Sequence, residues 1–336
     1  MTLLDFLRQK LSAEQFSTHS LLPFCPPHKS SKNNELINKM IQGEQKQFNV
    51  ICREEMNILA QAAYKANIRI AFWKGLVLSD VLYSPPETRV FCDIDLLINL
   101  DDLKYFLEMS KSLGYGFHLE GNIDEGIERF SKGTMHHYEL KKSVYNEWGR
   151  TAVLIEAHTH VYRQFVHQIE KPMHTSVTKS ALEVSVLFDG HGFENMYVMN
   201  NHDHLLALVM HLVKHFFNDI KGSMKNPNHG HYFNMQQLLD IDLFIAKHNI
   251  DYAVLFERAI EWNIVSELVF ILKIIQIYNP SKFSEININE IYYKHRRRTG
   301  FIANSIDYFI ENEGDFDNLF ELLLLPPRDV VKYCKQ

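Results

Sequence analysis

A change of hydrophobic period near residue 68 constrains the fold of this chain more than any other feature of its sequence. Before that point, apolar residues recur at helical spacing over residues 3–11 and again over 36–64. After it, apolar residues alternate over 68–72 as in a strand, and a helical pattern follows over 74–82. We therefore predict a helical N-terminal segment, residues 1–66, ahead of an α/β region.

Strand and helix patterns continue to alternate beyond residue 82. They end in a hairpin that pairs 182–188 with 196–199 around Asp189-Gly190. The order strand, helix, strand, helix, strand, strand predicts a small mixed-sheet α/β core over residues 67–200. The other elements predicted there are a strand over 92–98, a helix over 103–113, and strands over 137–140 and 152–158.

The last part of the chain has helical periodicity almost throughout, which predicts a helical C-terminal domain over residues 201–336. The whole chain is thus expected to be an α+β protein, with the mixed-sheet core between two helical parts. A length of 336 residues can accommodate this organisation. The helices predicted in the last part are 205–217, 236–247, 252–262, 265–278, 288–312 and 316–325.

The composition excludes several classes of protein. Hydrophobic residues make up 46% of the chain and charged residues 23%, which is ordinary globular usage and excludes broad disorder. A formal net charge of -6 disfavours general nucleic-acid binding, because that requires clustered Lys and Arg. No apolar stretch reaches the ~20 residues of a membrane span. The four cysteines form no C-x-x-C pair, which disfavours a zinc site built on thiolates. Because the N-terminus also lacks a signal pattern, we expect a cytoplasmic protein with reduced thiols.

Two carboxylates lie two residues apart on the strand predicted for 92–98. Asp93 and Asp95 therefore project from one face of that strand, about 6.6 to 6.8 Å apart along the chain. Neighbouring charges on an apolar strand repel and lose hydration unless a cation or hydrogen bonds compensate. Mg²⁺ compensates well, because it binds carboxylate oxygens and keeps water or phosphate oxygens as further ligands. Such pairs also occur at exposed strand ends, so the pair alone does not establish a metal site.

Other residues around this pair strengthen the metal hypothesis. Gly75 follows a strand and opens a helix, where a phosphate can approach backbone N–H groups. Lys74 and Arg89 flank the acidic strand and could bind anionic oxygens. Glu156 supplies a third acid on a later strand with the same alternation, and His158 follows it two residues on.

In their order and spacing, these motifs resemble the uncharacterised nucleotidyltransferase family of the DNA polymerase β-like nucleotidyltransferase superfamily. The resemblance covers residues 68–246, and it is the combination of motifs that carries it. The runs concerned are Phe72-Trp73-Lys74-Gly75, Arg89, Asp93-Ile94-Asp95-Leu96-Leu97-Ile98, Ile155-Glu156-Ala157-His158, Asn201-His202-Asp203-His204-Leu205-Leu206 with His211, and Leu238-Leu239-Asp240-Ile241-Asp242.

The resemblance implies an enzyme that moves a nucleoside monophosphate from an NTP such as ATP to a hydroxyl group and releases pyrophosphate. Asp93, Asp95 and Glu156 would be its catalytic acids and would hold two Mg²⁺ ions. The acceptor would be a small molecule, a peptide or a protein, and the sequence does not identify it. The residues expected to contact the nucleotide are Lys74, Gly75, Arg89, His158 and His211.

Histidine is abundant, with 18 copies, and two pairs suggest further contacts. His211 and His215 lie four residues apart on a predicted helix, so they share one face, as a metal or phosphate contact requires. The same spacing suits two histidines of a helical core or interface. His136-His137 precedes a predicted strand and could edge the acidic pair.

The dipeptide His202-Asp203 resembles the centre of a metal-dependent phosphohydrolase motif. With His167 and Asp242 it would form a His/Asp metal site. A helix start explains it more simply, with a cap at 200–201 and an acid in the first turn. Three functions thus remain open: nucleotidyltransferase, His/Asp phosphohydrolase, and a catalytically inactive nucleotidyltransferase-like binding protein.

Overall fold

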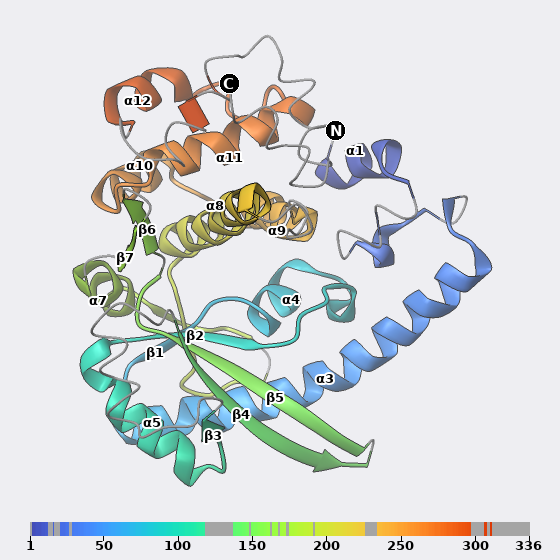
Figure 1. Ribbon diagram of the computed structural model, residues 1–336, viewed down its shortest axis with the longest axis vertical. Coiled ribbons are helices and arrows are strands. Elements are labelled where there is room, and N and C mark those ends of the chain that lie inside the picture. Colours follow the sequence, from blue (N-terminus) through green and yellow to red (C-terminus); the bar gives the residue numbers. More distant parts are fainter. Residues whose placement is uncertain are drawn as a thin grey trace. The chain divides into compact units, whose positions relative to one another are not determined.

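A computed structural model of the chain divides it into two compact units (Figure 1). The first unit comprises Met1–Asn38, Phe165–Ile169 and Leu205–Gln336, and the second comprises Lys39–Gln164 and Glu170–His204. The structure describes residues 2–12, 16, 21–26, 29–117, 137–147, 149–161, 163–166, 169–172, 175–190, 192–225, 234–296, 306–307 and 310.

A mixed sheet of seven strands, counted over the described residues, forms the centre of the second unit in the order β3-β4-β5-β2-β1-β9-β8. The β2 strand pairs parallel with β5 and antiparallel with β1, whose other neighbour, β9, is parallel. Figure 1 shows the long β4–β5 hairpin extending past the shorter strands. The strands are β1 (Ile70–Phe72), β2 (Ile94–Ile98), β3 (Gly116–Phe117), β4 (His137–Asn146), β5 (Gly149–His158), β8 (Val186–Leu187) and β9 (Tyr197–Val198); β6 (Arg163–Val166) and β7 (Ile169–Pro172) pair separately.

Helices cover this sheet because each of them has one apolar face. Every residue of β2 is buried, so helices or neighbouring strands exclude water from both of its faces. One hydrophobic cluster joins the strands to α3, α4 and α5, and the burial of its side chains is the main source of stability. The helices of this unit are α3 (Lys32–Lys65, which begins in the first unit), α4 (Leu76–Leu82), α5 (Leu103–Ser112) and α7 (Thr175–Glu183), with 3₁₀ turns η3 (Pro86–Thr88) and η4 (Leu100–Asp102).

The described residues of the first unit are mainly helical, and those at 165–166 and 169 belong to the strands β6 and β7. Its central helix, α11, is buried along nearly its whole length, and Phe6 of α1 packs on Tyr278 with ring centroids 5.9 Å apart. Several helices have N-cap side chains that accept hydrogen bonds from the first turn. The Thr2 side chain accepts one from the backbone N–H of Asp5, and the Asp251 side chain accepts hydrogen bonds from the backbone N–H groups of Ala253 and Val254. The elements are η1 (Leu22–Phe24), α1 (Leu3–Lys10), α8 (Asn201–Lys225, which begins in the second unit), α9 (Met235–Lys247), α10 (Tyr252–Glu261), α11 (Val265–Tyr278) and α12 (Ile288–His295).

The predicted fold class is confirmed, since a mixed sheet is accompanied by a helical N-terminal part and a helical C-terminal part. Several boundaries were wrong. The strand predicted over 92–98 begins at Ile94, so Asp93 directly precedes it, and the helix predicted over 205–217 spans Asn201–Lys225. The helix predicted over 288–312 ends at His295, because Arg296 is extended with φ -60° and ψ 144°. Residues 182–183, predicted as strand, form the end of α7, whose apolar residues follow the helical period. The helix predicted over 316–325 lies outside the described residues.

Among the residues that the structure describes, no helix is long and apolar enough to cross a membrane.

A buried carboxylate ties α3 to the edge of the sheet. Glu55, on α3, is 5% exposed and accepts a hydrogen bond from the Tyr115 hydroxyl at 2.7 Å. Lys142 of β4 donates to both carboxylate oxygens of Glu55 at 2.9 Å. A buried charge needs such partners, because removing one of them leaves the cost of desolvation without compensation.

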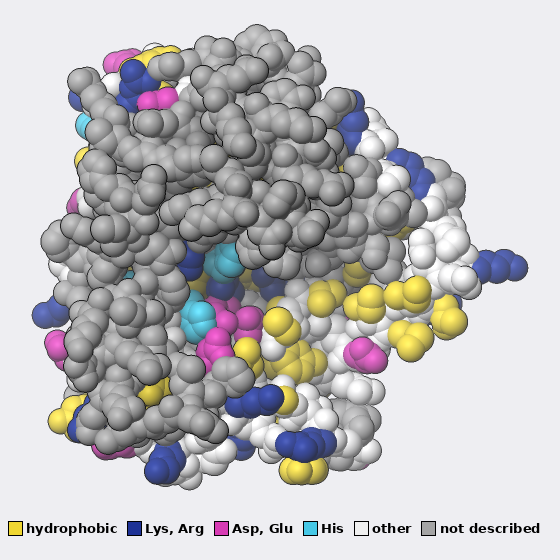
Figure 2. Space-filling view, viewed as in Figure 1, with side chains coloured by type: hydrophobic (Ala, Val, Ile, Leu, Met, Phe, Trp, Pro, Cys, Tyr) yellow, Lys and Arg dark blue, Asp and Glu magenta, His cyan; other side chains and the backbone are white. Residues whose placement is uncertain are grey.

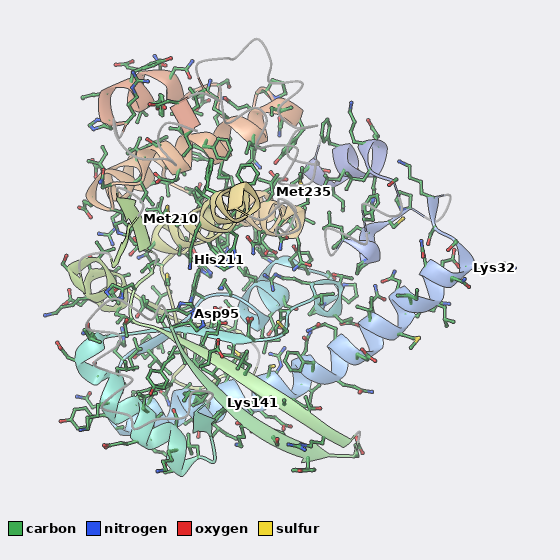
Figure 3. The ribbon with its side chains drawn as sticks, viewed as in Figure 1. Lys32, Asp95, Lys141, Met210, His211 and Met235 are labelled. Atoms are coloured by element: carbon green, nitrogen blue, oxygen red, sulfur yellow. The ribbon has the colours of Figure 1, made fainter. Side chains whose placement is uncertain are left out.

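Lys142→Met should therefore lower the free energy of unfolding by about 3 kcal/mol in urea titrations, because Glu55 loses its counter-charge. The double variant with Glu55→Gln should recover much of this loss. The matched control is Lys141→Met, on the opposite face of β4, where the side chain is exposed; Lys141 is labelled in Figure 3. Equal stability of the Lys142→Met single variant and the double variant would show that the ion pair does not stabilise the fold.

Candidate active site

Three strand ends of the second unit bring acidic and basic side chains together. Trp73, directly after β1, donates its backbone N–H to the carbonyl of Asp95 at 3.4 Å, so the β1 end lies beside β2. On the other side, the parallel register of β2 and β5 aligns Asp95 with Glu156. On the face shown in Figure 2, acidic side chains gather in one group with a histidine against it. Asp95 is labelled in Figure 3.

The turn from β1 into α4 depends on Gly75. Its φ of +52° and ψ of -118° are strained for a residue with a side chain, and an added Cβ would lie 2.8 Å from the carbonyl oxygen of Asp93. The turn is held from outside as well, because Arg89 donates to the Gly75 carbonyl at 3.2 Å and His204 donates through Nε2 to the carbonyl of Trp73. The glycine motif therefore permits a close approach of this turn to the acidic strand.

Asp95 is the most buried acid of the group, with a side chain that is 1% exposed. Its Oδ1 lies 2.7 Å from Nζ of Lys74 and 3.0 Å from Nε2 of His158. Burial alone would raise the pKa of this carboxyl, but the Lys74 ammonium and the hydrogen bond from His158 outweigh burial and hold the pKa well below its usual range. Asp95 is therefore ionised, and Lys74 and His158 both contact its carboxylate.

Asp93 is in the opposite electrostatic situation. Burial and the nearby charge of Asp95 raise the pKa of its carboxyl from 3.8 to about 6, against a smaller opposing effect of Lys74. Ionisation of Asp93 thus costs free energy in the folded protein. Strongly perturbed carboxylates of this kind are more frequent at functional sites than elsewhere.

Glu156 lies between two histidines. Its Oε2 is 3.4 Å from Nε2 of His158, and its Oε1 is 3.6 Å from Nε2 of His137, which also contacts Oε1 of Glu139 at 3.1 Å. Burial would raise the pKa of Glu156, but the hydrogen bond with His158 and the charges of His137 and His158 together outweigh it, and the pKa is lowered. For His158, burial lowers the pKa but the bonds to Asp95 and Glu156 raise it overall; for His137, burial dominates and the pKa is lowered.

Several residues singled out in the sequence thus lie together in the second unit. Lys74, Asp95, Glu156 and His158 are joined by direct contacts, and Asp93 interacts with them electrostatically. His211 lies on a helix of the first unit, with its ring centroid 4.4 Å from that of His215, and its contact with a nucleotide stays a prediction.

Arg89 is 6% exposed, and its hydrogen bond to the carbonyl of Gly75 supports the turn. In the sequence it was a candidate for binding anionic oxygens. The contact with Gly75 gives it a second role, which is to hold the backbone of the glycine turn beside the acidic strand.

His137 was noted at the start of a strand but was not counted among the expected site residues. It belongs to the site because the antiparallel register of β4 and β5 sets it opposite His158 and sets Glu139 opposite Glu156. The spacing of His137 and Glu139 on one strand face was the available signal.

The residues nominated for a phosphohydrolase site have other partners. Asn200 caps α8 by accepting from the backbone N–H groups of His202 and Asp203, and it donates to the Asp203 carboxylate at 3.0 Å. Asp242 pairs with Lys282. The simpler explanation of His202-Asp203, a helix start, is confirmed, while His167 lies outside the described residues.

Comparison with known proteins adds a family. The sequence matches the family described as "Uncharacterised nucleotidyltransferase" over residues 17–279, a span that includes the whole second unit. No curated protein matches the sequence. A crystal structure of JHP933 from Helicobacter pylori matches 81% of this chain and 97% of that chain, with 12% identity and a TM-score of 0.33, and a likeness at this level supports no conclusion.

The contrast between the two aspartates predicts opposite effects of removing each charge. With a chelator at pH 8, Asp93→Asn should raise the free energy of unfolding by at most about 3 kcal/mol, since each unit of pKa shift corresponds to about 1.4 kcal/mol. Asp95→Asn should lower it, because Lys74 and His158 lose their partner.

The pH dependence of these effects gives the control. The gain from Asp93→Asn should shrink as the pH falls through 6 and vanish near pH 4, because the wild-type carboxyl is then protonated in the folded state. The deficit of Asp95→Asn should persist to about pH 4, since the pKa of Asp95 is lowered by folding. Changes of the same sign in both variants at pH 8 would refute this electrostatic description.

Proposed function

The chain belongs to the uncharacterised nucleotidyltransferase family, and from this premise we propose that it is a Mg²⁺-dependent nucleotidyltransferase of the DNA polymerase β-like type. It transfers a nucleoside monophosphate from an NTP to a hydroxyl of a small molecule, peptide or protein, and pyrophosphate is released.

The main support is an excess of negative charge at the adjoining strand ends. Asp93, Asp95 and Glu156 are half-buried or buried there, and the ammonium of Lys74 compensates one of the three charges. The raised pKa of Asp93 reflects that imbalance, after the effect of its burial. A divalent cation would reverse it, and carboxylate oxygens are the protein ligands that Mg²⁺ prefers. The donor set therefore fits the ion that the family resemblance implies.

In this proposal Asp93 and Asp95 hold Mg²⁺, and Glu156 completes the carboxylate set on the side of the acceptor. Bound there, Mg²⁺ supplies positive charge for the phosphate oxygens and for the attacking hydroxyl oxygen. The low pKa of Asp95 keeps it ionised throughout the physiological range, so one ligand is always available. Asp93 must lose its proton before it can bind, which makes metal affinity fall as the pH drops through about 6.

Lys74 has two tasks in the proposed cycle. Before substrate binds, its ammonium neutralises Asp95 at 2.7 Å. The same ammonium would bind an anionic oxygen of the triphosphate as a point charge if a cation at Asp95 took over the compensation of that carboxylate. Gly75 and Arg89 keep the backbone of this turn against the acidic strand, so Lys74 stays within reach of both partners.

A thermal-shift panel of the four NTPs, with and without Mg²⁺, tests this function. At least one NTP should raise the melting temperature when Mg²⁺ is present and should have no effect with a chelator. The shift should be lost in Asp93→Asn, Asp95→Asn and Glu156→Gln, each measured against the same variant without nucleotide. Asp102→Asn, in the same unit at the start of α5, is the matched control and should keep the shift.

The active NTP should then label an acceptor in cell extract through its α-phosphate, with release of pyrophosphate. Asp93→Asn and Asp95→Asn should lower this rate by at least about 100-fold, because each removes a metal ligand. No stabilisation by any NTP, or equal labelling by wild type and both variants, would contradict the proposal.

A further inference from the structure

Two imidazoles and one carboxylate of the second unit can act as ligands of the same ion. His137, Glu156 and His158 each offer a ligand atom, and these atoms lie within 4.8 Å of one another. Within the described parts of the chain, this is the only group of three or more His, Cys, Asp or Glu residues with that property.

The separations of these atoms are close to those between ligands of one metal ion. Atoms about 2.1 Å from an ion lie about 3.0 Å apart at a right angle and about 3.4 Å apart at the tetrahedral angle. Nε2 of His158 is 3.4 Å from Oε2 of Glu156, and Nε2 of His137 is 3.6 Å from Oε1 of Glu156. Small side-chain rotations would therefore suffice to bring all three onto one ion.

The backbone beneath the group is held in place by the sheet. The β4 and β5 strands pair over ten residues without interruption, and His137 lies directly opposite His158. Side chains of such cross-strand pairs are neighbours on one face of the sheet. The three side chains are 26%, 19% and 14% exposed for His137, Glu156 and His158, so an ion can reach them from solvent.

We propose that His137, Glu156 and His158 bind a first-row transition-metal dication, of which Zn²⁺ is the one to test first. Imidazole nitrogen suits Zn²⁺ and its neighbours in the series, whereas Mg²⁺ takes oxygen ligands in a near-ideal octahedron. Two histidines and one glutamate also form a familiar open zinc site, in which water or substrate takes the fourth position. The site shares Glu156 with the carboxylate set proposed for Mg²⁺, and its two imidazole ligands distinguish it from that set.

A carboxylate of Glu139 or of Asp95 can take the fourth position in place of water. Oε1 of Glu139 lies 3.1 Å from Nε2 of His137, and Oδ1 of Asp95 lies 3.0 Å from Nε2 of His158. Both distances equal the separation of adjacent ligands around one ion. The extra negative charge also favours a dication over a neutral ligand.

The inference does not depend on nucleotidyl transfer, since it concerns the binding of metal alone. Protein stripped with a chelator is titrated with Zn²⁺ against a competing zinc indicator, in millimolar Mg²⁺ and without nucleotide. Wild type should bind one Zn²⁺ per chain. Co²⁺ in place of Zn²⁺ should give visible absorption bands typical of nitrogen and oxygen coordination.

His137→Ala and His158→Ala should each raise the Zn²⁺ dissociation constant by about 100-fold or more. Glu156→Gln should do the same. Loss of a residue that only hydrogen-bonds a metal ligand lowers metal affinity by about 10- to 100-fold, and loss of the ligand itself should lower it further. Two controls should bind Zn²⁺ like wild type: His248→Ala, a half-buried histidine of the first unit, and Asp93→Asn, which removes a proposed Mg²⁺ ligand.

Melting curves of the metal-free variants establish that they are folded, and the Co²⁺ spectrum of wild type does not depend on any variant. Absence of stoichiometric Zn²⁺ binding by wild type would overturn the inference. So would an affinity unchanged in both histidine variants. Because Asp93→Asn should abolish NTP binding and retain Zn²⁺, the two proposals can fail separately.

Discussion

The ion pair between Lys74 and the buried Asp95 organises the centre of the second unit. It can form because β1 and β2 are antiparallel neighbours and because Gly75 turns the chain tightly against the carbonyl of Asp93. His158, from β5 on the other side of β2, supplies a second partner to the same oxygen atom. Three chain segments thus meet at one carboxylate whose charge must be compensated wherever water is excluded.

The same arrangement places Asp93 and Asp95 in different electrostatic environments. Asp95 stabilises the fold, and its interactions keep it ionised, whereas Asp93 is held ionised at a cost. An ionised carboxylate of the second kind lowers the stability of the fold at neutral pH, and in the proposed function a bound cation would compensate its charge. Glu156 is intermediate, since His158 compensates part of its charge. The carboxylate that stabilises the fold, Asp95, and the carboxylate proposed mainly for cation binding, Asp93, therefore lie close together but differ in how their charges are compensated.

The period of the hydrophobic residues predicted most of the helices and strands. The two-residue spacing of Asp93 and Asp95 predicted that their charges would interact. The Lys74–Asp95 contact could not be predicted, because it depends on which strands pair and in which register. The position of His137 opposite His158 likewise follows from the hairpin register, not from local sequence. Glu55 reads as an ordinary polar position of α3 until Tyr115 and Lys142 are brought to it by the fold. These contacts were not predicted because they depend on which distant segments of the chain pair in the fold, and no local sequence pattern encodes that pairing.

A crystal structure with a non-hydrolysable NTP and Mn²⁺ in place of Mg²⁺ would show whether Asp93 and Asp95 bind the cation, because Mn²⁺ is located by its anomalous scattering. We expect Mn²⁺ to be bound by carboxylate oxygens of Asp93 and Asp95, with the ammonium of Lys74 moved from Asp95 to the triphosphate. An unchanged Lys74–Asp95 ion pair, with no Mn²⁺ at either aspartate while the nucleotide is bound, would contradict this proposal.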